Sequence, residues 1–356
     1  MRHRPEGAAG LPLMPRLGTA TKIAGLGMGA AAAVSGLAYG AERLVVARTR
    51  RRPDPDADRH FVPPADEVRV LDSHDGGTIS VLRRGSGPPL VLCHGVTLSN
   101  RVWVKQLETL PEQGFTVYAV DSRGHGDSKS GTSGHSVANL ARDLATVLEE
   151  LDLRDAVLVG HSMGGIAVQA LAAYHPEIVD ARARGLVLLS TLARTMFSDA
   201  RRLHRLVERH GDALPDFGTL MARRNLGFFL ARMGFGSNPT PSHVELTRQM
   251  IESCDAETTR LATRALLGLD LVPDIARIDL PTLVIGGSAD LITPPAESRR
   301  IARTIPGARL VMVEGGGHML MLERTEEVDR LIVEFAREVG GEGDGELERS
   351  VAGDAR

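Results

Sequence analysis

Three residue types in this 356-residue chain suit nucleophilic catalysis, and the most informative is the serine of Gly160-His161-Ser162-Met163-Gly164, which fits the pattern G-x-S-x-G. An apolar run at 156–159 precedes this motif and predicts a strand, and the run at 166–174 predicts a helix. A serine in such a turn has strained backbone angles, and its hydroxyl lies at a helix N-terminus, which favours negative charge. The alternative interpretation is a glycine-rich turn whose serine only caps the helix.

A serine hydroxyl is a weak nucleophile until a base takes its proton, so a histidine must lie nearby. Among the 12 histidines, His318 follows the last predicted strand and is the predicted base. The three glycines at 315–317 predict a mobile loop that can bring its imidazole over the sheet edge. His161 adjoins Ser162, but we expect its side chain to point away from the hydroxyl. We expect His94 to shape its loop and His125 to be a turn residue.

An acidic residue must hold the histidine in the correct tautomer and stabilise its charged form. Asp290 follows the preceding predicted strand, and it completes the order Ser162, Asp290, His318 expected for this arrangement. Asp199 is the alternative acid. Structural roles, as ion pairs or caps, are predicted for two nearby glutamates, Glu314 and Glu323.

Attack on a carbonyl creates an oxyanion, which needs two preorganised donors. The predicted donors are the backbone N–H groups of Met163, directly after the serine, and of Val96, in the loop after the strand at 89–93. Because both are backbone groups, loop geometry should matter more than the side chains at these positions.

Alternating strands and helices must position these residues. Strands are predicted at 68–71, 78–82, 89–93, 115–120, 156–159, 185–190, 282–286 and 309–313. Helices are predicted at 136–151, 166–174, 296–304 and 323–339. This alternation predicts an α/β fold with a mostly parallel sheet covered on both faces.

The alternation lapses between Thr191 and about Ile278, which separates core segments at 61–190 and 279–339. We interpret 191–278 as a helical cap over the strand ends where the serine lies. Its predicted helices are at 198–210, 219–233 and 242–267. The phenylalanines at 228, 229 and 235 are either the core of this cap or substrate contacts, and both can hold together.

Residues 1–60 do not resemble part of a globular core. The stretch 23–41 is uncharged and long enough to cross a bilayer. This stretch has three possible interpretations. It is a membrane anchor or interfacial helix, a cleaved export signal, or a helix packed on the catalytic domain, and the first would give membrane association. A cytoplasmic or exported location is the alternative to a membrane one. Residues 50–58 predict a charged linker, and the polar tail at 340–356 predicts disorder.

The net charge of −3 and the pI near 6.5 give no electrostatic basis for binding nucleic acid. The two cysteines, Cys93 and Cys254, lack metal-ligand spacing. We expect both to be small buried side chains and not part of a disulfide framework. We therefore predict no metal site.

The chain resembles α/β-hydrolase-fold serine hydrolases of the esterase or lipase type with a helical cap, across Val68 to Val339. The residues that carry the resemblance are His94-Gly95 with Ser99 and Trp103, the Asp121–Ser128 turn, Gly160–Gly165, Gly286–Asp290 and Gly315–His318. The resemblance implies an eight-stranded sheet, an acyl-enzyme mechanism and no cofactor. A serine at 162, where some members carry aspartate, argues against epoxide hydrolase and haloalkane dehalogenase chemistry.

These observations predict hydrolysis of a small-molecule carboxylic ester, with a small or moderately hydrophobic substrate. Two other activities on the same fold stay open: carbon–carbon bond hydrolysis, and cofactor-free haloperoxidase or perhydrolase chemistry. A hypothesis of another class is a non-catalytic binding protein that retains the fold.

Overall fold

The computed structural model describes residues 39–195 and 217–341. The chain divides into two units, Met1–Arg48 and Thr49–Arg356, and the described strands all belong to the second. In the first unit, residues 39–48 are helical. No helix in the described ranges is long and apolar enough to cross a membrane. Three predicted features lie outside these ranges: residues 23–38 of the apolar stretch 23–41, the helix predicted at 198–210, and the tail after residue 341.

The second unit is built on an eight-stranded sheet in the order β1-β2-β4-β3-β5-β6-β7-β8. Its strands β1 and β2 pair antiparallel, as do β2 and β4, and the remaining pairs are parallel. The predicted α/β class and mostly parallel sheet are confirmed. The strands are β1 (Glu67–Asp72), β2 (Thr78–Gly85), β3 (Pro89–Cys93), β4 (Thr116–Val120), β5 (Ala156–His161), β6 (Ala183–Leu189), β7 (Thr282–Gly287) and β8 (Arg309–Val313).

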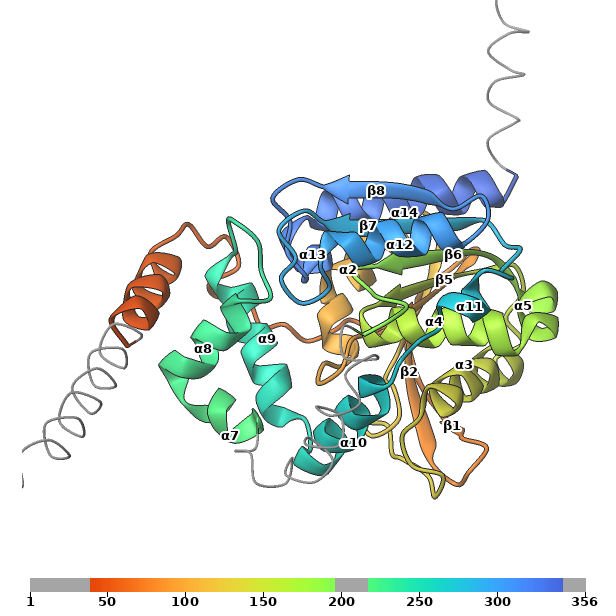
Figure 1. Cartoon of the computed structure of the whole chain (residues 1–356), viewed down its shortest axis with the longest axis horizontal. Coiled ribbons are helices and arrows are strands. Elements are labelled where there is room, and N and C mark those ends of the chain that lie inside the picture. The colour runs from red at the N-terminus through yellow and green to blue at the C-terminus, as the bar shows by residue number, and fades with distance from the viewer. Residues whose placement is uncertain (1–38, 196–216, 342–356) are drawn as a thin grey trace, which may run out of the picture. The chain divides into compact units, whose positions relative to one another are not determined.

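Helices cover both faces of this sheet, as its buried strands require. On one face lie α3 (Val137–Glu150), α4 (Met163–Tyr174), α11 (Val272–Ile275) and α12 (Pro295–Thr304). On the other lie α2 (Val104–Glu112) and α14 (Thr325–Val339) (Figure 1). Three short elements complete the core: η1 (Asn100–Trp103), α5 (Pro176–Arg182) and α13 (Leu320–Glu323).

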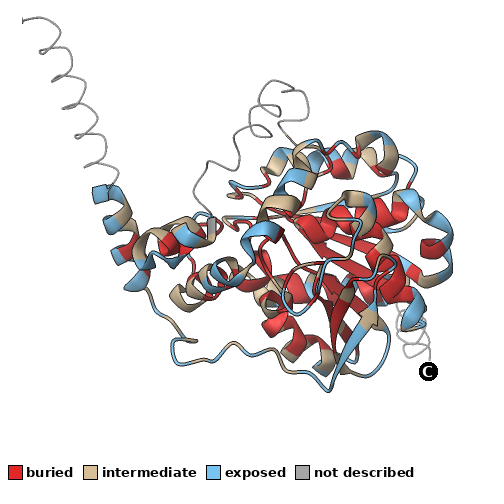
Figure 2. Cartoon of the chain, turned by 90° about the horizontal axis from the view of Figure 1, so that it is seen from below, coloured by how far each residue is buried: buried red, intermediate tan, exposed pale blue. Residues whose placement is uncertain are grey.

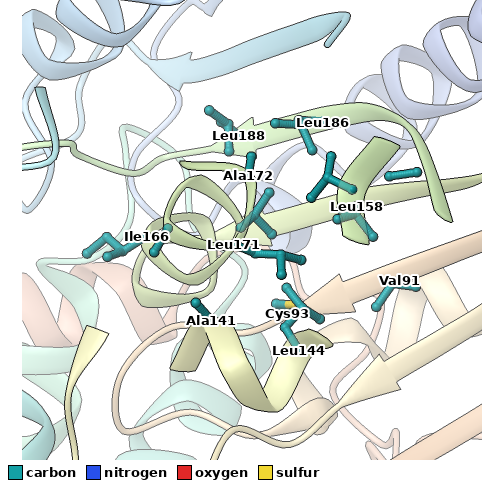
Figure 3. Close-up of a cluster of buried hydrophobic side chains, with 14 of the residues drawn as sticks. Val91, Cys93, Ala141, Leu144, Leu158, Ile166, Leu171, Ala172, Leu186 and Leu188 are labelled. Atoms are coloured by element: carbon teal, nitrogen blue, oxygen red, sulfur yellow. The ribbon is translucent and has the colours of Figure 1, made fainter. Parts of the chain in front are cut away.

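One cluster of the core lies between the sheet and the face covered by α3 and α4. Figure 3 shows Cys93 of β3 facing Leu144 of α3 and Leu171 of α4. Figure 2 shows buried residues concentrated in the sheet and in the helix faces turned toward it. The prediction of a buried Cys93 is confirmed, whereas Cys254 is only partly buried, because it lies in the exposed connection after α9.

Two predicted helices of the insertion are each interrupted. The helix predicted at 219–233 is α7 (Phe217–Ala222) followed by α8 (Arg224–Arg232). The helix predicted at 242–267 is α9 (Pro241–Ser253) followed by α10 (Ala256–Leu267). The second break has a clear cause, because Cys254 is extended and the Asp255 side chain caps α10 by accepting from the Thr258 N–H at 2.8 Å.

Candidate active site

Ser162 occupies a strained turn between β5 and α4, with φ 52° and ψ −117°. A Cβ on Gly164 would lie 2.2 Å from the carbonyl oxygen of Cys93, so β3 and α4 can approach this closely only through glycine. The main chain of Ser162 is held on both sides, because its N–H donates to Leu189 O at 3.1 Å and its carbonyl accepts from Thr191 Oγ1 at 2.7 Å. Its side chain makes no capping hydrogen bond to α4, which argues against a serine that only caps the helix.

Asp290 and His318 meet at the same edge of the sheet, in the loops after β7 and β8. Their closest approach is 2.9 Å, between Asp290 Oδ2 and His318 Nδ1, and both residues are buried. The Asp290 carboxylate also accepts from Thr293, through its hydroxyl at 2.6 Å and its backbone N–H at 2.8 Å. Burial alone would raise the pKa of Asp290, but the charge of His318 and these hydrogen bonds lower it below its usual value. Asp290 is therefore a carboxylate that fixes the histidine tautomer.

His161 links the serine turn to the histidine loop. Its ring packs against that of His318 with centroids 4.6 Å apart, and its Nε2 donates to the His318 carbonyl oxygen at 3.0 Å. Complete burial, followed by the charge of His318, lowers its pKa well below the ordinary value, so the imidazole is neutral. Ser162 thus adjoins a side chain that touches His318. Sequence reasoning missed this contact, and no pattern in the sequence signals it.

The glycines before His318 allow close packing rather than the free loop we predicted. A Cβ on Gly317 would lie 2.3 Å from the backbone nitrogen of Gly236, in the connection between α8 and α9. The N–H groups of His318 and Met319 both donate to Gly234 O, at 2.9 and 3.1 Å. Glu323 accepts from the N–H groups of Gly236 and Gly317, which is the structural role predicted for it.

The predicted oxyanion donors lie on adjoining loops. A Cβ on Gly95, next to Val96, would lie 3.1 Å from Ser162 Cβ, so the loop after β3 contacts the serine turn. Met163 opens α4, where backbone N–H groups have no partner inside the helix. Within the described residues, no acceptor is assigned to the N–H of Val96.

Buried polar groups hold this loop, as predicted for His94. Its Nδ1 donates to Gly95 O at 2.7 Å and its Nε2 accepts from the Ser122 N–H at 3.0 Å. Burial and the charge of His125 lower the pKa of His94 to about 3, so it is a neutral support rather than a base. Asp121 fixes the next turn of the loop by accepting from the Asn100 N–H at 2.7 Å. The alternative acid, Asp199, lies outside the described residues.

Nothing in the described ranges forms a group of three or more histidine, cysteine or acidic side chains that could hold a metal ion. The groups that the structure places at this sheet edge are a serine, a carboxylate-bound imidazole and backbone N–H groups. Three features together define a class of protein, the α/β hydrolases. They are the strand order of the sheet, the strained turn at the serine and the hydrogen-bonded Asp–His pair.

Comparison with known proteins agrees with this class. The family model of the alpha/beta hydrolase fold matches residues 88–325, more than half of the chain, so the protein belongs to the α/β-hydrolase family and is a hydrolase-class enzyme. A non-heme chloroperoxidase from Kitasatospora aureofaciens is 32% identical, over 75% of this chain and 98% of its own length. A non-heme haloperoxidase from Rhodococcus erythropolis is 30% identical, over 74% of this chain and 98% of its own length. A thermophilic esterase from Thermogutta terrifontis shares 30% identity at a TM-score of 0.62, over 77% of this chain and 99% of that structure.

Proposed function

We propose that this protein hydrolyses carboxylic esters of small or moderately hydrophobic molecules through an acyl-enzyme. The observation that carries the proposal is the buried Asp290–His318 hydrogen bond at the sheet edge where Ser162 is held in its strained turn. The similarity to an esterase supports the reaction class.

In the proposed reaction, His318 Nε2 takes the proton of the Ser162 hydroxyl as its oxygen attacks the ester carbonyl. The N–H groups of Val96 and Met163 stabilise the oxyanion, and Asp290 stabilises the imidazolium. His318 then gives the proton to the departing alkoxide, which leaves as the alcohol. Water, deprotonated by the same imidazole, attacks the acyl-enzyme, and Ser162 is regenerated with release of the carboxylic acid.

We further propose that residues 191–278 form a cap over this site. The connection between α8 and α9 supports this, because Gly234 accepts hydrogen bonds from the His318 loop. Phe228 and Phe235 are buried, which favours a role in the cap core, whereas Phe229 is only partly buried. An ester chain-length series would show whether this region sets substrate size.

Ser162→Ala tests the assignment of the nucleophile. We expect the rate of p-nitrophenyl ester hydrolysis to fall by at least about a thousand-fold, and labelling by a fluorophosphonate probe to be lost. Ser253→Ala is the matched control, because Ser253 is exposed at the end of α9 and its loss should change neither readout. Full turnover by Ser162→Ala would overturn the assignment. Absence of labelling in the wild type would instead favour a non-catalytic binding protein.

A second candidate is perhydrolysis, which is favoured by the relatives named as haloperoxidases. Hydrogen peroxide would replace water in attacking the acyl-enzyme, its proton would pass to His318, and a peracid would leave as Ser162 is regenerated. The peracid would then transfer its terminal oxygen to the halide, which gives hypohalous acid and returns the carboxylate. Bromination of a dye with acetate, peroxide and bromide tests this, and the reaction should be lost in Ser162→Ala. A diketone substrate in the same panel tests carbon–carbon bond hydrolysis.

A further inference from the structure

A cavity of about 530 Å³ lies away from the proposed catalytic residues. Its walls come from η1, from α8 and α9, and from the segment 50–62, which we call the strap. Neither Ser162, Asp290 nor His318 lines it. Its volume is in the range of small-molecule sites.

The strap is fixed to both the core and the insertion, so the cavity has defined walls. Asp56 accepts two hydrogen bonds of 2.8 Å from Lys105 of α2 and one of 2.9 Å from His243 of α9. Asp54 binds the N-terminus of α9, through the N–H and hydroxyl of Ser242 at 2.8 and 2.7 Å. The predicted linker at 50–58 is therefore, in its second half, a bound segment rather than a free one.

Positive charge exceeds negative charge around this cavity. Its lining contains four arginines, Arg50, Arg59, Arg101 and Arg224. Arg59 pairs with Glu108 and Asp56, and Arg50 bonds to the neutral Asn225 side chain at 3.0 Å. Across the described ranges, no acidic partner is assigned to Arg101 or to Arg224. Arg101 is partly buried, and this burial lowers its pKa, since a guanidinium loses hydration without gaining a counter-charge.

The two carboxylates of the lining, Asp54 and Glu245, do not offset this charge. Asp54 is engaged by Ser242, and Glu245 pairs with Arg248 at 2.7 Å. Four large apolar residues line the cavity, Phe61, Val62, Phe228 and Leu246. Phe228 and Leu246 are almost fully buried, and the Arg50 guanidinium lies 4.7 Å from the Phe228 ring centroid, so Phe61 and Val62 are the accessible ones.

We propose that this cavity binds a small organic anion whose carboxylate or phosphate head pairs with Arg101 and Arg224 and whose apolar body packs on Phe61 and Val62, the two accessible large apolar residues of its lining. The planar guanidinium donates two parallel hydrogen bonds to either oxyanion and pairs with its charge, whereas a quaternary ammonium head accepts no hydrogen bond and is repelled. Because the walls come from the strap, the core and the insertion, a bound anion would join all three.

Isothermal titration of the full chain with octanoate, octyl phosphate and octyltrimethylammonium tests the proposal. We expect at least one of the two anions to bind with 1:1 stoichiometry and the cation not to bind. The stronger anion identifies the preferred head. Arg101→Gln together with Arg224→Gln should weaken anion binding at least ten-fold, and Arg299→Gln, an exposed arginine on α12 outside the cavity, should leave it unchanged.

Arg224→Gln alone keeps the test valid if the double variant does not fold, because Arg224 is exposed and its side chain has no assigned role in packing. We expect it to weaken binding about three-fold, with the thermal midpoint of the free protein unchanged. Equal affinity in wild type and Arg224→Gln, or equal binding of the cation, would overturn the proposal.

Discussion

Two regions of the second unit hold their functional groups by different means. At the sheet edge, Ser162 and the loops around it are positioned by backbone geometry: a positive φ, glycines in close contact, and main-chain hydrogen bonds to Leu189 and Gly234. The strap is positioned by side chains, chiefly the carboxylates of Asp54 and Asp56. The first arrangement tolerates almost no added atom, whereas the second depends on single charges that can be removed without a steric clash.

We expect the largest loss of stability when a side chain is added where β3 and α4 are in backbone contact. In Gly164→Ala, the new Cβ would lie 2.2 Å from Cys93 O, and this backbone atom cannot move without shifting β3. We expect little or no folded protein, measured as soluble yield and a cooperative thermal transition. Gly307→Ala is the control, because Gly307 has φ +70° but no atom within 4 Å of the added Cβ. It should cost only about 1 to 2 kcal/mol. Equal stability of the two variants would contradict this view of the sheet edge.

A buried ion network supports the loop after β4, and its loss should have the next largest effect. Arg123 is fully buried and binds Asp143 at 2.6 Å and Asp75 at 3.1 Å. Arg123→Met would leave two buried carboxylates without their cation, so the free energy of unfolding should fall by about 3 to 5 kcal/mol. Urea denaturation measures this. A loss below 1 kcal/mol would mean that water solvates the carboxylates.

The neutral histidines of the sheet edge predict acid sensitivity. Burial lowers the pKa of His94 to about 3 and of His125 to about 4, and it lowers that of His161 as well. Below the unfolded-state pKa of about 6.5, the unfolded chain binds protons that the folded chain does not, so stability falls as pH falls. Burial raises the pKa of Asp121 to about 6, which acts in the opposite direction. Two lowered histidine pKa values elsewhere, those of His135 and His243, are opposed by the raised pKa values of Glu323 and Asp329. The three imidazoles less the one carboxyl named above leave a net of two groups, so we expect a loss of about 3 kcal/mol between pH 6 and pH 5.

Urea denaturation at pH 7.5, 6 and 5 checks this expectation. Stability that is constant between pH 6 and pH 5 would show that these imidazoles are hydrated in the folded protein.

We expect the smallest loss of stability when a single charge is removed from the strap. Asp56→Asn removes the charge that holds Lys105 and His243, so we expect a loss of about 1 kcal/mol and faster amide exchange in the strap and the first turn of α9. Asp58→Asn is the control, because Asp58 is exposed in the same segment. Exchange at the sheet edge should not change in either variant. Faster exchange there would show that the strap also supports the proposed active site.

The contrast between these regions also explains what the sequence predicts. Strands such as β3 (PLVLC) and β5 (AVLVGH) are short buried runs rich in valine and leucine, so their positions along the chain follow from local composition. The order Ser162, Asp290, His318 follows from those strands, because parallel strands end at one edge of a sheet. The Asp290–His318 contact was therefore predictable from the sequence.

Other contacts were not predictable, because they join distant residues through side chains. Asp56 is separated by 49 residues from Lys105 and by 187 from His243, and neither pair has a local pattern. Thr293 is different, since a threonine three residues after Asp290 fits an Asx-type turn and could have been proposed as a partner. The break before α10 was similarly marked by Asp255, a favoured helix cap.

The hydrogen bonds from His318 and Met319 to Gly234 have a consequence for engineering. A chimaera that exchanges the segment between β6 and β7 for that of a relative would also replace Gly234, whose carbonyl accepts the hydrogen bond from the His318 N–H. Specificity and the position of the base would then change together, so donor segments must be grafted with the matching 315–319 loop.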